Sequence, residues 1–187
     1  MRLKKPRVTP IDESQWSDSV KETLRQIKVG QGAVPNIFKT LAHHPDLLKR
    51  WLVFGNHVLF KSTLPARERE LIILRIGWLC EAEYEWAQHV RIGKQVKLTD
   101  DEVHRIKVGP TAAGWSEQDK LLLEATDELY KDAFITDATW QGLSKLYNTQ
   151  QLMDIVFAVG QYNLVSMALN TLGVQLDPDL NTSFANT

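Results

Sequence analysis

The segment 80–95, CEAEYEWAQHVRIGKQ, gathers acidic, aromatic and imidazole side chains into one short stretch. Ala82, Glu85, His89 and Ile92 follow one another at intervals of three or four residues, so a helix would place them on one face. A carboxylate close to an imidazole orients the ring and favours its protonated form. Such a pair can move protons at neutral pH. The spacing therefore indicates a proton-transfer site at Glu85 and His89.

A second carboxylate comes from the apolar segment before this one. Residues 65–79, PARERELIILRIGWL, are expected to form a helix that carries Glu70 beside its buried stretch. A short break at Glu81 leads into the next helix, and antiparallel packing of the two helices would bring Glu70 close to Glu85 and His89. The plainer alternative is that Glu70 pairs with a neighbouring arginine and that Glu85 and His89 form a solvated pair, which is worth only about 0.2–0.5 kcal/mol.

Two aromatic residues and two arginines complete the set of candidate site residues. Tyr84 and Trp86 would form an aromatic wall that shields the imidazole from water, although both residue types are also common packing residues. Arg75 and Arg91 could hold a substrate carboxylate, or could simply carry surface charge.

Helical patterns extend along the whole chain, and strand patterns are nearly absent. The expected helical segments are 11–30, 36–44, 46–60, 62–80, 82–95, 98–106, 117–132, 138–147 and 150–173, several of them short. Four sites are expected to cap the amino ends of helices: Asn36, Thr99 with Glu102 in a capping box, Ser116 and Asp137. The expected helix stops are Gly30, Pro45 and Gly173. The sequence predicts an all-α bundle of about eight helices.

Composition and charge narrow the class of protein. A chain of 187 residues suits a single domain over 1–187, with a flexible arm at about 1–10 and a tail at about 178–187. A net charge of −1 gives no electrostatic reason to expect nucleic acid or an anionic membrane as partner. No run approaches the ~18 apolar residues of a membrane span. A single cysteine and the lack of an apolar leader favour a cytoplasmic protein.

The segment 67–95, RERELIILRIGWLCEAEYEWAQHVRIGKQ, closely resembles the signature region of the carboxymuconolactone decarboxylase family, which includes the AhpD-like proteins. In that family a Glu begins one helix, and the next helix carries a Tyr-Glu-Trp or Cys-containing segment that ends in His. The flanking segments 35–48 and 156–177 also look like those of longer members. The resemblance implies an AhpD-like helical bundle with a functional pocket at Glu70 and His89.

The family contains two chemistries, and the first is redox chemistry at a Cys-x-x-Cys pair. Alignment on His89 puts those cysteine positions at Ala82 and Glu85, and neither is cysteine. Cys80 lies two residues earlier, which on a helix turns it about 200° away. A dithiol relay needs two thiols. AhpD-like peroxidase or disulfide reductase activity is therefore disfavoured, and a one-cysteine peroxidase at Cys80 is left as the redox alternative.

The second chemistry is that of a cofactor-free lyase acting on a small carboxylated lactone from aromatic catabolism. In this interpretation His89 donates a proton or stabilises charge, Glu70 or Glu85 tunes it, and Arg75 or Arg91 holds a carboxylate. A second carboxylate at Glu85 would repel a dianionic substrate unless it is protonated or turned outward. The exact lactone is therefore left open.

A metal site and a non-catalytic binding protein are the alternatives from other classes of function. A metal could bind Glu85 with His89, or His43 with His44 and Asp46, but neither set has a zinc or di-iron spacing, so no metal or cofactor is expected. A non-catalytic small-molecule-binding oligomer is the more serious alternative. The resemblance also implies assembly as a homo-oligomer, a trimer or a hexamer, whichever function holds.

Overall fold

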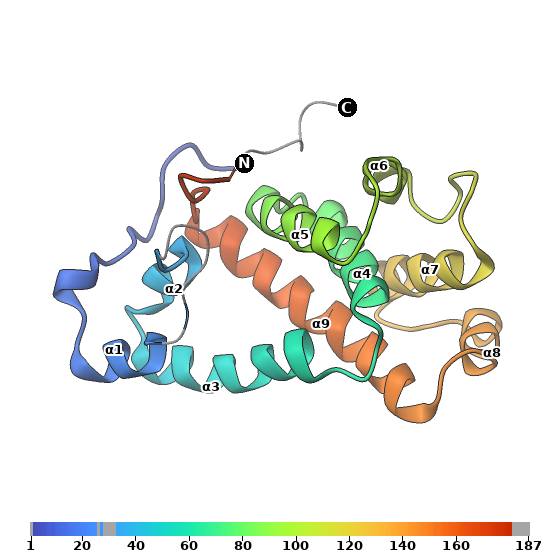
Figure 1. Cartoon of the computed structure of the whole chain (residues 1–187), viewed down its shortest axis with the longest axis horizontal. Coiled ribbons are helices and arrows are strands. Elements are labelled where there is room, and N and C mark those ends of the chain that lie inside the picture. Colours follow the sequence, from blue (N-terminus) through green and yellow to red (C-terminus); the bar gives the residue numbers. More distant parts are fainter. Residues whose placement is uncertain (1, 26, 28–32, 181–187) are drawn as a thin grey trace.

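The structure is a computed structural model that describes residues 2–25, 27 and 33–180, and these ranges contain α-helices and no β-strand (Figure 1). Nine α-helices are found there, which confirms the all-α prediction with one helix more than the predicted eight. They are α1 (Asp18–Leu24), α2 (Asn36–Leu41), α3 (Pro45–Asn56), α4 (Ala66–Leu79), α5 (Glu83–Gln95), α6 (Asp100–Val108), α7 (Glu117–Asp132), α8 (Asp137–Ser144) and α9 (Thr149–Leu172). A 3₁₀ turn at Glu13–Gln15 precedes α1, and a π turn at His57–Lys61 extends α3.

Helix α4 forms the centre of the main core. It packs against α5, α6, α7 and α9, and its residues Leu71, Ile72, Ile73, Leu74 and Ile76 have no exposed surface. A helix that is apolar on every side is one that its neighbours surround. This burial fixes the position of Glu70, which lies directly before the apolar run and is itself fully buried.

The amino-terminal helices form a second, smaller cluster. Figure 1 shows α1, α2 and α3 on one side of the molecule and α4 to α8 on the other, with the long α9 running between them. Trp16, Val20, Leu24 and Leu48 are buried in this second cluster. A third cluster, around Tyr84 and the carboxyl end of α9, connects the two.

Helix α9 is long and apolar enough to cross a membrane by length and composition alone, although no membrane span was predicted from the sequence. Half of its most apolar stretch is buried inside the structure, and it packs against α4, α5, α7 and α8. The buried core helix of a bundle passes the same test, so the composition of α9 is explained by its packing.

Most helix boundaries follow the local signals. Thr99 and Glu102 form the predicted capping box, Ser116 caps α7, and Gly173 ends α9 in a left-handed conformation with a φ of 70°. The predicted stop at Gly30 lies outside the described residues. The break at Glu81 is also present, because this residue takes a φ of 51° between α4 and α5.

Three boundary predictions were wrong. Thr136, not Asp137, caps α8, since its hydroxyl accepts from the Thr139 amide. Asn36 is the first residue of α2 rather than its cap, and its side chain donates to the Gln175 and Leu176 carbonyls. Pro45 does not end α2 but begins α3, where its missing N–H costs nothing.

The amino-terminal arm lies against the carboxyl end of α9. The amides of Arg7 and Val8 donate to the Leu172 carbonyl at 2.9 and 3.2 Å, and the Gln175 side chain donates to the Leu3 carbonyl. These contacts connect residues 3 to 8 of the arm to the end of α9 and the segment after it, and the flexibility of the arm stays a prediction. Residues 181–187 of the predicted tail are outside the described ranges, and a single domain over 1–187 stays a prediction.

Gly109, at the end of α6, allows Arg75 to cap that helix. Arg75 Nη1 donates to the Ile106 and Lys107 carbonyls, and a Cβ at Gly109 would lie 2.5 Å from Arg75 Nη2. Gly109 also has a φ of 95° and a ψ of −157°, a region that is essentially restricted to glycine.

We therefore expect Gly109→Ala to lower the free energy of unfolding by at least ~2 kcal/mol, through backbone strain and the displaced guanidinium. Urea unfolding measures this. Gly160→Ala is the matched control, because a Cβ there meets nothing within 4 Å and α9 should gain up to ~1 kcal/mol from alanine. Equal effects of the two substitutions would contradict the role given to Gly109.

Candidate active site

Helices α4 and α5 form an antiparallel pair that brings the predicted acidic and imidazole groups together. A Cβ on Gly77 would contact the Glu85 side chain, and one on Gly93 would contact Leu74, so later residues of α4 face earlier residues of α5. The left-handed residue Glu81 makes the sharp reversal between the helices. As a result Glu70, near the start of α4, faces His89 in the middle of α5.

Glu70, Glu85 and His89 form one continuous array, called the triad below. His89 Nδ1 lies 2.6 Å from Glu70 Oε2, in a hydrogen bond in which the protonated ring donates. His89 Nε2 lies 2.9 Å from Glu85 Oε1. Glu70 is fully buried, whereas Glu85 and His89 keep 4% and 5% exposure, so Glu70 forms the inner end of the array.

The contact between His89 and Glu85 is an ion pair without good hydrogen-bond angles. Glu85 Oε1 is buried and accepts no hydrogen bond from the described residues. A buried carboxylate oxygen without a donor is unfavourable in a resting protein. It is therefore available to accept a hydrogen bond from a bound molecule.

The charges around His89 decide its protonation state. Burial alone lowers the pKa of the imidazole, but the carboxylates of Glu70 and Glu85 outweigh that effect and raise the His89 pKa to about 10. His89 is thus an imidazolium at neutral pH, held between two carboxylates. This arrangement stores a proton at a buried position.

Two further residues surround the triad, and neither was among the predicted site residues. The ring of Tyr162, from α9, packs edge-on against His89 with centroids 4.9 Å apart, and burial raises its pKa well above the usual value, so it is neutral. Arg69 Nη2 lies 3.4 Å from Glu70 Oε1, while its buried Nε finds no acceptor in the described structure. The position of Arg69 next to Glu70 was a usable signal, but nothing in the sequence pointed to Tyr162, 73 residues after His89 in the chain.

Tyr84 and Arg91 are engaged with other parts of the chain. The Tyr84 hydroxyl donates to Asp177 Oδ2 at 2.7 Å and accepts from the Ile37 amide at 3.4 Å, so it ties α5 to α2 and to the segment after α9. Arg91 Nη1 donates to Asp179 Oδ2 at 2.9 Å. These contacts serve the carboxyl-terminal segment, and a substrate-binding role for either residue stays a prediction.

Trp86 and Arg75 face the other side of α4 and α5. Trp86 is fully buried in the main core and packs on Trp78 with ring centroids 5.5 Å apart. Arg75 forms two hydrogen bonds to the Asp127 carboxylate, at 2.6 and 2.7 Å, besides capping α6. The structure therefore brings Glu70, Glu85 and His89 together, whereas the four remaining candidates make their contacts away from the triad.

Cys80 is not a member of the triad. It is the residue that ends α4, and its Sγ donates to Asn163 Oδ1 at 3.2 Å. Burial raises the pKa of the Cys80 thiol, which disfavours the reactive thiolate.

The histidines of the AHHPD segment have structural contacts. His43 Nε2 lies 2.9 Å from the Thr9 carbonyl, and His44 Nδ1 accepts from the Leu47 amide to cap α3. Among the described residues, no group of three His, Cys, Asp or Glu side chains is placed to hold a metal ion.

Comparison with known proteins gives a family match over part of the chain. Residues 45–128, which span α3 to α7, match the sequence profile of the carboxymuconolactone decarboxylase family. No curated protein matches the sequence.

Solved structures share the fold at low sequence identity. A peroxidase-related protein from a Silicibacter species has a TM-score of 0.82 at 18% identity, over 97% of this chain and 98% of that one. A peroxidase-related protein with an AhpD core, from Ralstonia eutropha, has a TM-score of 0.81 at 20% identity, over 92% and 93% of the two chains. The debrominase Bmp8 in complex with 2,3,4-tribromopyrrole has a TM-score of 0.74 at 14% identity, over 94% of each chain. Residues 45–128 of this chain therefore match the carboxymuconolactone decarboxylase family, and the chain has an all-α fold similar to that of AhpD-like proteins.

Proposed function

We propose that this protein is a cofactor-free carboxy-lyase that removes CO₂ from a small carboxylated lactone by proton transfer at the triad. The observation that carries the proposal is the buried imidazolium of His89 between Glu70 and Glu85. The family match supports the same class of activity. General acid catalysis by a positioned side chain typically contributes ~10²–10⁴ in rate.

The reaction divides into two steps. The bond between the ring carbon and the substrate carboxylate breaks, CO₂ leaves, and the electron pair delocalises into the conjugated lactone carbonyl. The His89 imidazolium then delivers its proton to carbon, and the neutral ring regains a proton from solvent. Glu70 acts as the positioning residue, because its hydrogen bond to Nδ1 leaves Nε2 as the nitrogen that faces the more accessible end of the array.

The net charge of the site determines how strongly it repels an anionic substrate. The carboxylate of Glu85 lies against the His89 imidazolium, and that of Glu70 is shared between His89 and Arg69. The formal charge of these four groups is zero, which reduces the repulsion expected from Glu85. We infer that Arg69, whose buried Nε lacks an acceptor, receives the substrate carboxylate in place of Arg75 or Arg91.

The proposal is tested with carboxymuconolactone and smaller carboxylated lactones. In thermal unfolding of the wild type, a compound that binds should stabilise the protein by ~2.7 kcal/mol when present at 100 times its dissociation constant. Each compound that binds is then assayed for enzymatic release of CO₂. Arg69→Gln should weaken binding, whereas Arg91→Gln is the matched control at an arginine that is paired with Asp179. If no carboxylated compound binds the wild type, the lyase proposal fails and a non-catalytic binding role takes its place.

A redox function receives less support from this site. Peroxidase-related proteins and a debrominase share the fold, but Ala82 and Glu85 occupy the positions of the cysteine pair, and Cys80 contacts Asn163. We expect Cys80→Ser to change CO₂ release by less than about twofold, because serine can also donate to Asn163 and the thiol takes no part in proton transfer. Turnover of the wild type and the variant measures this. Loss of activity in a folded Cys80→Ser protein would reverse the preference for a lyase.

We also propose that the protein acts in the cytoplasm as a homo-oligomer, a trimer or a hexamer. Support comes from large apolar side chains exposed on α3 and α9, among them Val53, Phe157 and Met167 at 73%, 52% and 55% exposure. Exposed apolar surface of this kind commonly marks an interface.

Light scattering during size-exclusion chromatography tests the assembly. The expected mass is three or six times the chain mass of 21.4 kDa. Phe157→Glu should lower it, because a charge in an apolar interface is costly to bury. Val108→Glu is the control, because Val108 is on α6 with 56% exposure, and this substitution should leave the measured mass unchanged. A wild-type protein that elutes at 21.4 kDa would refute the proposal.

A further inference from the structure

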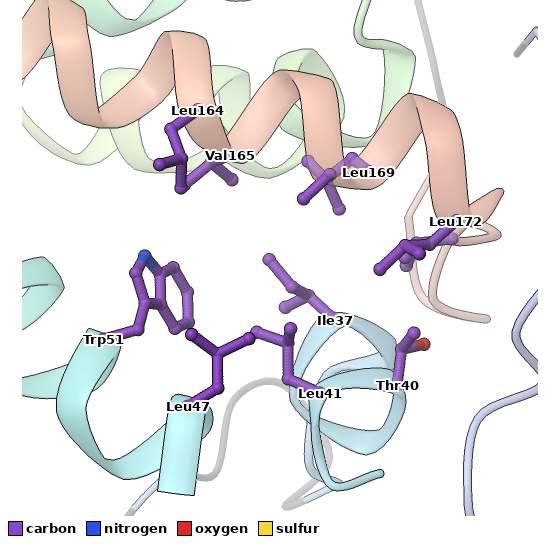
Figure 2. Close-up of a pocket in the computed structure, with 11 residues that line it drawn as sticks. Ile37, Thr40, Leu41, Leu47, Trp51, Leu164, Val165, Leu169 and Leu172 are labelled. Carbon is purple, nitrogen blue, oxygen red and sulfur yellow. The ribbon is translucent and has the colours of Figure 1, made fainter. Parts of the chain in front are cut away.

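An apolar pocket, separate from the triad, lies between α2, α3 and the carboxyl-terminal half of α9 (Figure 2). Its cavity volume is about 90 Å³, below the ~300–1,000 Å³ of sites for drug-sized ligands, so it suits only a very small molecule. Ile37, Leu41, Leu47 and Leu169 are among the aliphatic residues that line it. No triad residue contributes to the lining, so the pocket is not explained by the proposed lyase site.

The pocket contains a hydrogen-bond donor that the described structure leaves unused. Trp51 is the aromatic residue of the lining, and its Nε1 is buried without a hydrogen-bond partner. Figure 2 shows this nitrogen on the edge of the indole ring that faces α9, opposite Leu164 and Val165. An unpaired buried N–H costs roughly 1–3 kcal/mol, and a ligand with an acceptor oxygen would remove that cost.

Thr40 provides a useful contrast at the other end of the pocket. Its Oγ1 is also buried and without a partner in the described residues. Figure 2, however, shows this oxygen pointing away from the space at the centre of the pocket. A ligand in the pocket is therefore expected to use Trp51 and not Thr40.

The chemistry of the lining defines the ligand class. No Asp, Glu, Lys, Arg or His is among the lining residues, so a charged ligand would lose its hydration without compensation. A lone water would have too few polar partners, because an ordered water needs two to four. The remaining class is uncharged and largely apolar, with one acceptor oxygen.

We propose that this pocket binds a small, uncharged, mainly apolar molecule whose carbonyl oxygen accepts a hydrogen bond from Trp51 Nε1. The aliphatic walls supply most of the binding free energy, and the indole N–H fixes the orientation of the carbonyl. The proposal does not depend on the reaction at the triad, so it holds or fails independently of the lyase function.

Three ligands that share one ring test the proposal by NMR on ¹⁵N-labelled full-length protein: cyclohexanone, methylcyclohexane and cyclohexanecarboxylate. The protein has six tryptophans, and the indole resonance that disappears in Trp51→Phe identifies Trp51. Cyclohexanone should shift that resonance in a saturable way. Methylcyclohexane, which has no acceptor, should perturb the Val165 and Leu169 amides without shifting the Trp51 indole resonance downfield. Cyclohexanecarboxylate should not bind.

The variants separate the hydrogen bond from the apolar contacts. Trp51→Phe keeps an aromatic ring and should weaken cyclohexanone binding by about three- to tenfold, as followed on the Val165 and Leu169 amides. Thr40→Val should leave the affinity within about twofold. Ala168→Phe fills the pocket and should abolish binding.

Two results would overturn the proposal. One is a Trp51 indole resonance that does not move up to the solubility limit of cyclohexanone in the folded wild type. The other is unchanged cyclohexanone affinity in Trp51→Phe, whose fold is checked from its remaining indole and amide resonances. If Ala168→Phe fails to fold, these two results still decide the outcome.

Discussion

Replacement of His89 by glutamine is expected to lower kcat for CO₂ release by about 10²–10⁴, since the amide can occupy the same space but cannot deliver a proton. Glutamine can still donate one hydrogen bond to Glu70, so the inner end of the triad keeps a partner. Steady-state kinetics on the carboxylated lactone that binds best would measure the loss. The fall should lie in kcat, because the proton is needed after the substrate has bound.

This variant also separates an enzyme from a binding protein. A proton-transfer enzyme should retain substrate binding in His89→Gln, visible as a thermal shift close to that of the wild type, and should lose turnover. Glu70→Gln is the companion variant, expected to reduce kcat less, because Glu70 acts through the orientation and protonation of His89. Wild-type turnover in a folded His89→Gln protein would exclude the proposed mechanism.

Alkaline pH is expected to destabilise the fold in a range where most proteins change little. The pKa of His89 is about 10 in the folded protein and 6.5 in an unfolded chain, so the folded state holds the proton more tightly. The resulting stabilisation is fully present below pH 6.5 and is lost as the pH rises from about 6.5 to 10. The loss is on the order of 5 kcal/mol, from about 1.4 kcal/mol for each pKa unit.

Urea unfolding at a series of pH values would measure this slope. The slope also depends on the titratable side chains that contact the His89 imidazole. Glu70 and Glu85 favour the charged form of the imidazole, and Tyr162 stays neutral through this pH range because burial raises its pKa. The His89→Gln protein is the control, and its stability should vary much less between pH 6.5 and 10. A wild-type curve as flat as that of the variant would show that His89 is neutral in the folded protein.

The contacts within the triad could be predicted from the sequence. Glu85 and His89 lie four residues apart on one helix, so their contact follows from helix geometry alone. Glu70 required one further assumption, the antiparallel packing of α4 and α5. The apolar run of α4 and the reversal at Glu81 supported that assumption, and both features are local.

The remaining site residues depend on contacts that no local pattern reveals. Arg75 and Arg91 were plausible carboxylate ligands by residue type, but Asp127 and Asp179, far away in the chain, lie where they pair with these arginines. Tyr162 reaches His89 only because α9 crosses α5. Long-range pairing of this kind depends on how the helices dock, and spacing within one helix does not specify that docking.

Residues 172–177, at the end of α9 and just after it, form hydrogen bonds with residues from much earlier in the chain. Asp177 accepts from the Asn36 amide at 2.7 Å and from the Tyr84 hydroxyl, and the Leu172 carbonyl accepts from the amides of Arg7 and Val8. During synthesis these early segments emerge from the ribosome long before their partners exist, whereas α4 to α8 can begin to pack as they appear. The growing chain therefore lacks these contacts to its amino-terminal third until residues 172–177 have left the ribosome. A stalled or truncated product lacking residues 172–177 should leave that third open to proteolysis and to chaperones.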